Sequence, residues 1–437
     1  MTTKAVYELE ELFRKWPSLS EEERYATFRS LTRDQREDLF LDLSSHDQAE
    51  LILAMPEHER RTYLRILPPD DAADVIQHAP EEERGKLLDL LTPAARREVR
   101  ALLAYAEDEA GGVMSPRFAR LRPDMTVDEA IAYLRLQGRQ LETIYYAYVL
   151  DQEQHLLGVV SFRELFTAPG DAMVADIMEK DVIAVREDTD QEEVARLFST
   201  YDLVAIPVID DEKRIKGIVT VDDIVDVFQE EASEDMQKMG GMQALEEPYL
   251  ETGFWQMLRK RAGWLSLLFV GEMLTATAMS RYEAEIAQAV VLAVFIPLII
   301  SSGGNSGSQA STLVIRAMAL GEVRLRDWWR VASREILSGL GLGALLAAIG
   351  FARIVLWHAL GGSYGQHFLL IASAVALSLI GVVLFGTLTG SMLPFALRGL
   401  GLDPASASAP LVATMVDVTG LIIYFNVAAF ILRGALL

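Results

Sequence analysis

Five long apolar stretches in the C-terminal part of this chain limit most strongly how it can fold. They lie at about 264–280, 286–313, 336–357, 367–395 and 405–432. Each falls within or above the range of about 17–25 residues that a helix needs to cross a bilayer. Backbone groups inside lipid must be paired within the protein, so we expect five transmembrane helices here.

Basic residues at the ends of these stretches predict their orientation. Nine lie on one side and three on the other, namely Arg259, Lys260, Arg261, Arg316, Arg324, Arg326, Arg330, Arg334 and Arg398 against Arg281, Arg353 and Arg433. Positive charge concentrates in cytoplasmic loops, so we expect a cytoplasmic N-terminus and a C-terminus outside the cell membrane. The opening MTTKAVYELEELF lacks the basic-then-apolar pattern of a signal peptide, which agrees with a cytoplasmic soluble half.

Charge separates the chain into two unlike halves. The formal net charge is −23, yet residues 251–437 contain nine acidic and twelve basic residues, so the acidic surplus lies entirely in residues 1–250. A strongly acidic half disfavours nucleic acid or an anionic membrane surface as a partner and is compatible with cation binding. The chain has no Cys, which excludes disulfides, Cys-zinc sites and thiol nucleophiles.

Residues 1–104 show the pattern of many short helices. Breaks recur every 10–14 residues or so, and most place a capping residue or Pro before acidic residues, which is a helix-start signal. This spacing predicts a small superhelical stack. Asp70, Asp71 and Asp74 lie at one such start, where they serve either as capping and dipole-complementing residues, which local sequence favours, or as cation ligands at a domain interface.

Residues 114–230 contain an internal duplication. Each unit has a Met-led entry, a short strand, a Thr-started helix, two apolar strands joined by a charged turn, and a closing helix after Gly-Val-Val or Gly-Ile-Val. This order resembles a tandem cystathionine-β-synthase (CBS) domain pair. The resemblance implies regulation and often an adenosine nucleotide, so ATP is a candidate ligand, although no clear nucleotide signature is present.

A polar, acid-rich helix is expected after the duplication. Asp226, Glu230, Glu231, Glu234 and Asp235 recur there at spacings that place them on one or two adjacent faces. Like charges at such spacing repel unless cations lie between them. The segment is therefore either a cation-binding helix or a solvated connection between two domains.

The fifth apolar stretch carries one acid, Asp417, close to Thr414 and Thr419. A charged side chain in mid-membrane costs about 2.5–3.5 kcal/mol on insertion scales, and such residues usually mark ion pathways. No Lys or Arg lies between Arg398 and Arg433. Pro410 is expected to disturb the helix and free carbonyl groups, which would complete an all-oxygen environment suited to Mg2+ or Ca2+. The alternative is a structural Asp that hydrogen-bonds a neighbouring helix.

The second stretch ends in PLIISSGGNSGSQASTLVIRAMALGEV, residues 297–323. We expect its Pro and glycines to interrupt the helix, with the polar side chains of the break lining a pore, namely Asn305, Ser306, Ser308 and Gln309. Helix packing by the small residues is the alternative. The pattern is not a phosphate loop, because no Gly-Lys-Ser/Thr follows.

Together these pieces resemble the MgtE family of magnesium channels and transporters over essentially the whole chain. The segments that carry the resemblance are the acidic helical N-domain, AEDEAGGVMSPRF, the CBS pair, the acidic connecting helix, SGGNSGSQASTLVIRAMALGEV and APLVATMVDVTGLIIYF. The resemblance implies a homodimer with a Mg2+-conducting pore at its axis. It assigns the pore site to Asp417 and to the carbonyl of Ala413. The residues that we expect to line the pore are Asn305, Ser306, Gln309 and Thr414.

The resemblance also implies closure of the pore by cytosolic Mg2+ bound between the soluble parts. The implied metal ligands are Asp70 or Asp71 with Asp74, then Asp190, Glu192, Asp202, Asp223, Asp226, Glu231, Glu234 and Asp235, and Asp403 in the loop before the fifth stretch. Mg2+ is thus both the transported and the regulatory ion.

The sequence therefore predicts a multi-domain membrane protein that is not an enzyme. Its expected parts are an α-helical superhelical N-domain at 1–112, α/β CBS repeats at 113–170 and 171–228, a connecting plug helix at 229–258, and a five-helix transmembrane domain at 259–437. The expected function is Mg2+ uptake across the lipid bilayer, and the alternative is a transporter with Co2+, Ni2+ or Mn2+ as main substrate.

Two rival classes are disfavoured. A membrane aspartyl protease needs two acids that share a proton, and Glu272, the only other deep acid, has no matching motif. A CBS nucleotide sensor that uses the apolar stretches only as an anchor would not need five of them.

Overall fold

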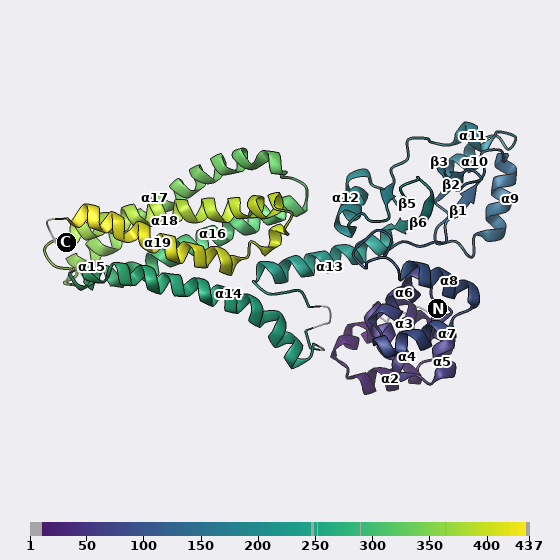
Figure 1. The fold of residues 1–437 in the computed structure, drawn as a ribbon, viewed down its shortest axis with the longest axis horizontal. Coiled ribbons are helices and arrows are strands. Elements are labelled where there is room, and N and C mark those ends of the chain that lie inside the picture. Colours follow the sequence, from purple (N-terminus) through teal and green to yellow (C-terminus); the bar gives the residue numbers. More distant parts are fainter. Residues whose placement is uncertain (1–10, 246–248, 251, 289, 363, 434–437) are drawn as a thin grey trace. The chain divides into compact units, whose positions relative to one another are not determined.

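The computed structural model describes residues 11–245, 249–250, 252–288, 290–362 and 364–433 (Figure 1). The chain divides into two compact units, Met1–Gln229 and Glu230–Leu437, which are described separately. The first unit holds short helices and two small sheets, and the second holds long apolar helices. The predicted fold class, a helical N-domain with a CBS pair and five membrane-length helices, is confirmed.

The N-terminal part of the first unit is a stack of short helices. They are the 3-10 helix η1 (Trp16–Ser18) and α2 (Glu21–Ser30), α3 (Arg33–Asp42), α4 (Ser45–Ala54), α5 (Glu57–Leu64), α6 (Pro69–His78), α7 (Glu81–Leu90) and α8 (Pro93–Leu102). Ser20 and Thr32 form capping boxes at two of the starts. Helix α2 contacts α4, α4 contacts α6, and α6 contacts α8, while α5 contacts α7. These contacts give the predicted superhelical stack around a core that includes Trp16 and Phe40.

Two similar α/β repeats follow. The first contains β1 (Ala119–Leu121), α9 (Val127–Gln137), β2 (Tyr146–Leu150), β3 (Leu156–Ser161) and α10 (Phe162–Thr167). The second contains α11 (Val174–Ile177), β4 (Val185–Arg186), α12 (Gln191–Tyr201), β5 (Ala205–Ile209), β6 (Ile215–Thr220) and α13 (Val221–Met239). In each repeat the first strand pairs parallel with the second, which pairs antiparallel with the third. The register shifts near the end of the second strand in both, so the structure reproduces the duplication.

The closing helix of the second repeat, α13, continues to Met239. It ends at Gly240 and Gly241, and Gly241 has a φ of 75°, a left-handed conformation that glycine adopts without a steric penalty. The next helix, α14, begins at Phe254. The predicted connecting segment 229–258 is therefore not one helix, because it contains the end of α13, an irregular connection and the start of α14. Residues 246–248 and 251 of this segment lie outside the described residues.

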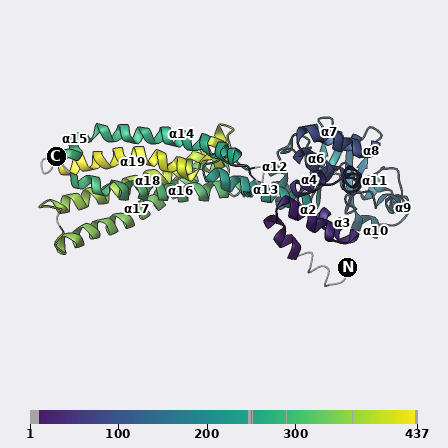
Figure 2. The ribbon, with the colours of Figure 1, turned by 90° about the horizontal axis from the view of Figure 1, so that it is seen from below.

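Among its described residues, the second unit contains five helical spans long and apolar enough to cross a membrane; they are labelled in Figure 2. Its elements are α14 (Phe254–Arg281), α15 (Glu283–Gln288), the 3-10 helix η2 (Val290–Phe295), α16 (Ile296–Ala319), the 3-10 helix η3 (Leu325–Asp327), α17 (Trp328–Ala359), α18 (Phe368–Gly399), the 3-10 helix η4 (Pro404–Ser406) and α19 (Ala409–Leu432). Helix α18 contacts α16, α17 and α19, so it lies at the centre of the bundle.

The second membrane span is not interrupted at its glycines. Helix α16 runs without a break from Ile296 to Ala319. A Cβ atom at Gly303 would lie 2.5 Å from Val382 Cγ1, and one at Gly307 would lie 2.7 Å from the Gly386 carbonyl oxygen of α18. The prediction of a broken helix is wrong, because these glycines allow two membrane helices to approach closely.

Pro410 likewise does not disturb the fifth span. It lies in the first turn of α19, where a helix tolerates proline because the missing N–H would have no intrahelical partner. The Ser408 side chain caps this helix by accepting a hydrogen bond from the Leu411 N–H at 3.3 Å. The expected freeing of carbonyl groups inside the span is therefore wrong.

Candidate ion pathway and regulatory acid clusters

The membrane acid Asp417 lies in an unbroken part of α19 and is half-buried in the bundle. Its carboxyl group is within hydrogen-bonding contact of the Glu272 carboxyl group on α14. The closest basic residues along α14 are Arg261 and Arg281, each at least two and a half turns from Glu272. Two acids thus meet in a membrane environment without a basic residue nearby on either helix.

Helix α14 follows α19 through a series of contacts. Trp264 Nε1 donates a hydrogen bond to Ser408 Oγ at 3.3 Å, and Asn426 Nδ2 donates one to the Tyr282 hydroxyl at 3.0 Å. Between them, a Cβ atom at Gly271 would lie 2.7 Å from Thr414 Cγ2. This packing places Glu272 beside Asp417. Sequence reasoning set Glu272 aside, although an acid inside an apolar helix was a usable signal.

The structure separates the expected pore-lining residues. Asn305 and Gln309 are exposed on one face of α16, whereas Ser306 is buried and its hydroxyl group has no hydrogen-bond partner. Thr414 donates from its hydroxyl group to the Pro410 carbonyl oxygen at 3.0 Å. Ala413 lies within the continuous helix α19.

Four expected metal ligands of the first unit gather in one acidic cluster, which we call the interdomain cluster. Asp70 and Asp71 begin α6, and Asp223 and Asp226 lie on α13. Asp70 is 5% exposed, and its Oδ1 atom has no hydrogen-bond partner. The Thr220 hydroxyl group donates to Asp223 Oδ2 at 2.7 Å.

Burial and mutual repulsion change the acidity of the interdomain cluster. Burial, with the nearby charges of Glu142 and Asp71, raises the pKa of Asp70 to about 7. Burial and the Asp223 charge raise the pKa of Asp71 to about 7, and burial also raises that of Asp223 to about 7. Burial first, and electrostatic repulsion second, therefore oppose full ionisation of these groups at neutral pH, and a bound cation would offset both.

Sequence reasoning missed Glu142, which precedes β2 in the first repeat and adds a further charge to the interdomain cluster. Its Oε2 atom accepts a hydrogen bond from the Ser115 hydroxyl group at 3.1 Å. Burial raises the pKa of Glu142 above its usual range. No local motif marks this residue, because it reaches the cluster only through the tertiary fold.

Other expected ligands have separate places in the first unit. Asp190 caps α12, where its Oδ1 atom accepts from the Glu192 N–H at 2.8 Å. Asp202 ends the same helix with a left-handed φ of 51°. Asp74 lies one turn along α6 from Asp70, and its carbonyl oxygen is 2.9 Å from His78 Nδ1.

A second acidic group lies in the membrane unit at the end of α13. Burial, with Asp403 and Glu231 nearby, raises the pKa of Asp235 to about 6. Lys238 Nζ lies 2.6 Å from Asp403 Oδ2 and also pairs with Glu234. The structure thus brings Asp403 to the acids of the connecting helix, together with a lysine that sequence reasoning overlooked.

Within the described ranges, no three or more His, Asp or Glu side chains are arranged to hold a metal ion. The acids therefore gather without forming a coordination sphere.

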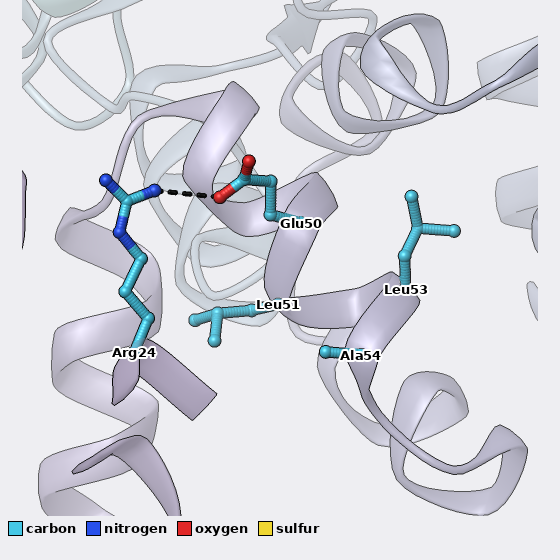
Figure 3. Close-up of a pocket in the computed structure, with 5 residues that line it drawn as sticks. All are labelled: Arg24, Glu50, Leu51, Leu53 and Ala54. Carbon is cyan, nitrogen blue, oxygen red and sulfur yellow. Dashed lines mark hydrogen bonds and ion pairs between the residues drawn. The ribbon is translucent and has the colours of Figure 1, made fainter. Parts of the chain in front are cut away.

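A hollow in the helical N-domain has a different character. Its volume is about 350 Å3, and it is lined by Arg24, Glu50, Leu51, Leu53 and Ala54 (Figure 3). The buried Arg24 guanidinium lies 2.8 Å from Glu50 Oε2 and 3.0 Å from Asp47 Oδ1, so it joins α2 to α4. The Arg24 charge at this hollow is paired within the protein, which is consistent with a structural role.

The fold and these sites define a class of protein, namely a multi-span membrane transporter for cations that also carries an acidic helical domain and a pair of α/β repeats. Family models agree over most of the chain. "Divalent cation transporter" matches residues 296–427, "MgtE intracellular N domain" matches 7–108, and "CBS domain" matches 110–171 and 174–230.

Curated relatives cover more of the chain in single matches. "Magnesium transporter MgtE" of Thermus thermophilus is 43% identical over 84% of this chain and 80% of its own length. The protein of the same name from Enterococcus faecalis is 36% identical over 77% of this chain and 72% of its own length. That from Bacillus subtilis is 33% identical over 83% of this chain and 78% of its own length. The chain belongs to the MgtE family of magnesium transporters.

A solved structure described as "the cytosolic domain of the Mg2+ channel MgtE in complex with ATP" is 43% identical. The match covers 50% of this chain and 90% of the solved chain, with a TM-score of 0.47. The relatives named above are transporters rather than enzymes. The predicted domain boundaries stay predictions.

Proposed function

We propose that this protein mediates Mg2+ uptake and that Asp417 is its pore acid. The contact between Asp417 and Glu272, away from any basic residue of their two helices, is the observation that carries the proposal. Carboxylates kept inside a membrane usually serve an ion path, and oxygen ligands suit Mg2+. The names of the relatives favour Mg2+ over Co2+, Ni2+ or Mn2+ as the main substrate.

Two copies of the chain would form the pore at their common axis. Two Asp417 side chains then supply a charge that matches one divalent cation. Mg2+ loses water reluctantly, so such a site would hold a largely hydrated ion with help from the Ala413 carbonyl and the Thr414 side chain. Asn305, Ser306 and Gln309 remain proposed pore-lining residues, and the exposed face of α16 that carries Asn305 and Gln309 is available to a second copy.

Cytosolic Mg2+ would close the pore through the acidic clusters. When Mg2+ is low, the acids within each of the two clusters repel one another. When Mg2+ is high, bound ions relieve this repulsion and favour the closed state, which is regulation by differential binding to two states. The raised pKa values of Asp70, Asp71 and Asp223 support this proposal, because burial, and then repulsion between these acids, disfavours their charged forms unless a cation is bound.

The cytoplasmic N-terminus, the outside C-terminus and the location in the cell membrane belong to the same proposal, and they rest on the distribution of basic residues. The predicted domain boundaries are retained as proposals. ATP at the CBS pair stays a prediction.

A paired Asp417 and Glu272 also meets one requirement of a membrane aspartyl protease, two acids in contact. The family of transporters to which the chain belongs argues against that chemistry.

The test is Mg2+ flux into proteoliposomes at low and at millimolar internal Mg2+. We expect wild-type flux to fall as internal Mg2+ rises, and Asp417→Asn to abolish flux at both concentrations. Glu283→Gln, which removes an exposed acid on α15, is the matched control and should behave as wild type. Flux that persists in Asp417→Asn would remove Asp417 from the pathway, and wild-type flux that ignores internal Mg2+ would remove the gating proposal.

A further inference from the structure

The end of α13 is fastened to the segment that leads into α19. Lys238 pairs with Asp403, at 2.6 Å, and with Glu234. Asp403 also caps η4, where its Oδ1 atom accepts from the Ala405 N–H at 2.8 Å. The Lys238 ammonium group therefore joins α13 to the capped turn η4, which lies just before α19, the proposed pore helix.

A second contact fastens the same two segments through Trp264 of α14. Gly241 lies so close that a Cβ atom there would be 2.8 Å from the Trp264 indole and 3.1 Å from Pro410 Cγ. The indole donates to Ser408 Oγ, the N-cap of α19. The Gln243 N–H donates to the Lys260 carbonyl oxygen at 3.1 Å, which ties the connection to α14.

The charge balance of this junction explains the need for a lysine. Glu231, Glu234, Asp235 and Asp403 interact there, and their mutual repulsion would separate α13 from the turn. Lys238 supplies a positive charge between Glu234 and Asp403. A hollow of about 510 Å3 beside it, lined in part by Glu234, Lys238, Lys260 and Trp264, leaves room for water and ions.

We propose that Lys238 is a tethered cation that latches the end of α13 to the start of the pore helix, at the acids where the proposed function places regulatory Mg2+. This inference rests on the proposed function. It adds that one of the cations that act in closure is a side chain of the protein itself, Lys238. The latch consists of the Lys238–Asp403 ion pair and the contact of Gly241 with Trp264. Lys238 lowers the amount of Mg2+ required for closure, because one cation of the closed state is already present.

The latch is connected to the ion pathway through α19, which is continuous, and through the start of α14. Ser408 caps α19 nine residues before Asp417, and α19 has no break between them. A released latch frees the N-terminal end of α19 and the Trp264 end of α14, whose Glu272 contacts Asp417. Closure and the geometry of the two membrane acids are thereby linked.

The first experiment measures the latch itself. The chain has no cysteine, so Met242→Cys, in the wall of the hollow beside Lys238, gives a single labelling site. We expect a maleimide to label it about two- to fivefold faster in Lys238→Met than with Lys238 present, in the absence of Mg2+. Lys238→Arg is the matched control and should label at the parent rate. Equal rates in all three proteins would overturn the latch.

The second experiment measures how the latch affects the inhibition of transport by internal Mg2+. In proteoliposomes, Lys238→Met should raise the internal Mg2+ concentration for half-inhibition about two- to fivefold, whereas Lys238→Arg should not. Lys238→Asp should raise it further, and the charge exchange Lys238→Asp with Asp403→Lys should reverse part of that rise. Faster labelling without any change in Mg2+ inhibition would refute the coupling between the latch and pore closure. Wild-type flux that does not respond to internal Mg2+ would refute the proposed function, and the labelling rates alone would then test the latch.

Discussion

Glycine 307 provides a direct test of how the second membrane span is built. A Cβ atom at this position would lie 2.7 Å from both the Gly386 carbonyl oxygen and Val412 Cγ1. Backbone atoms of α18 cannot move aside cheaply, and overpacking of this kind typically costs about 1–3 kcal/mol. Gly307→Ala should therefore destabilise the bundle by about 2 kcal/mol relative to an alanine placed where space exists.

Gly304→Ala is the matched control, because its Cβ atom would lie 3.6 Å from the nearest atom, Ala413 Cβ. Both substitutions lie in α16 and bring the same gain in helix propensity, which cancels in the comparison. Thermal unfolding in detergent should give an apparent Tm for Gly307→Ala lower by about 4–8 °C than for Gly304→Ala. Equal Tm values would refute close packing of α16 on α18 and would revive the interrupted, pore-lining helix.

Three further predictions concern other parts of the chain. Arg24→Met should lower the free energy of unfolding of the soluble segment by about 2 kcal/mol in urea, because it leaves Asp47 and Glu50 without their buried partner, whereas the exposed Arg97→Met should change little. Glu272→Gln should raise the external Mg2+ concentration for half-maximal flux about three- to tenfold, since one acid beside Asp417 is lost; an unchanged value would show that Glu272 does not act on the ion. The pKa values of Asp70, Asp71 and Asp223 are raised to about 7, so the folded soluble segment binds more protons than the unfolded segment between about pH 4 and 7. Its Tm without Mg2+ should therefore fall as the pH rises through that range. The Tm increase on adding Mg2+ should be larger at pH 8 than at pH 6, and the opposite order would contradict the interdomain cluster as a cation site.

The features that sequence predicted well depend on long, repeated patterns. Five apolar stretches, two units with the same strand order and a series of capped short helices each involve many residues, so no single position decides them. The interrupted α16 failed for the opposite reason. Gly303 and Gly307 carry no local sign of what they face, and only the approach of Val382 and Gly386 shows that they are packing positions.

The candidate sites show the same division. Asp417 could be found from sequence because an acid inside an apolar stretch is costly wherever it points. Glu272 carried the same signal, but its partner lies on another helix far along the chain, so proximity could not be read from spacing. Lys238 was missed because it follows a run of acids that suggested cation binding, although the structure places its own ammonium group between Glu234 and Asp403.

Helix α13 carries acids of both clusters, so its continuity should matter for regulation. Asp223 and Asp226 lie near its start and Lys238 near its end, twelve residues beyond Asp226. Replacing Gln229 and Glu230 by two glycines would weaken the helix at these positions by about 2 kcal/mol relative to two alanines. Both variants lose Glu230 and keep the other acids of α13, so the comparison isolates the helix. We expect the glycine variant to need about five- to thirtyfold more internal Mg2+ for half-inhibition than the alanine variant, because a flexible joint dissipates the coupling between the two ends. If both variants close at the same Mg2+ concentration, the interdomain cluster does not act through α13, and the acids beside Lys238 must sense Mg2+ on their own.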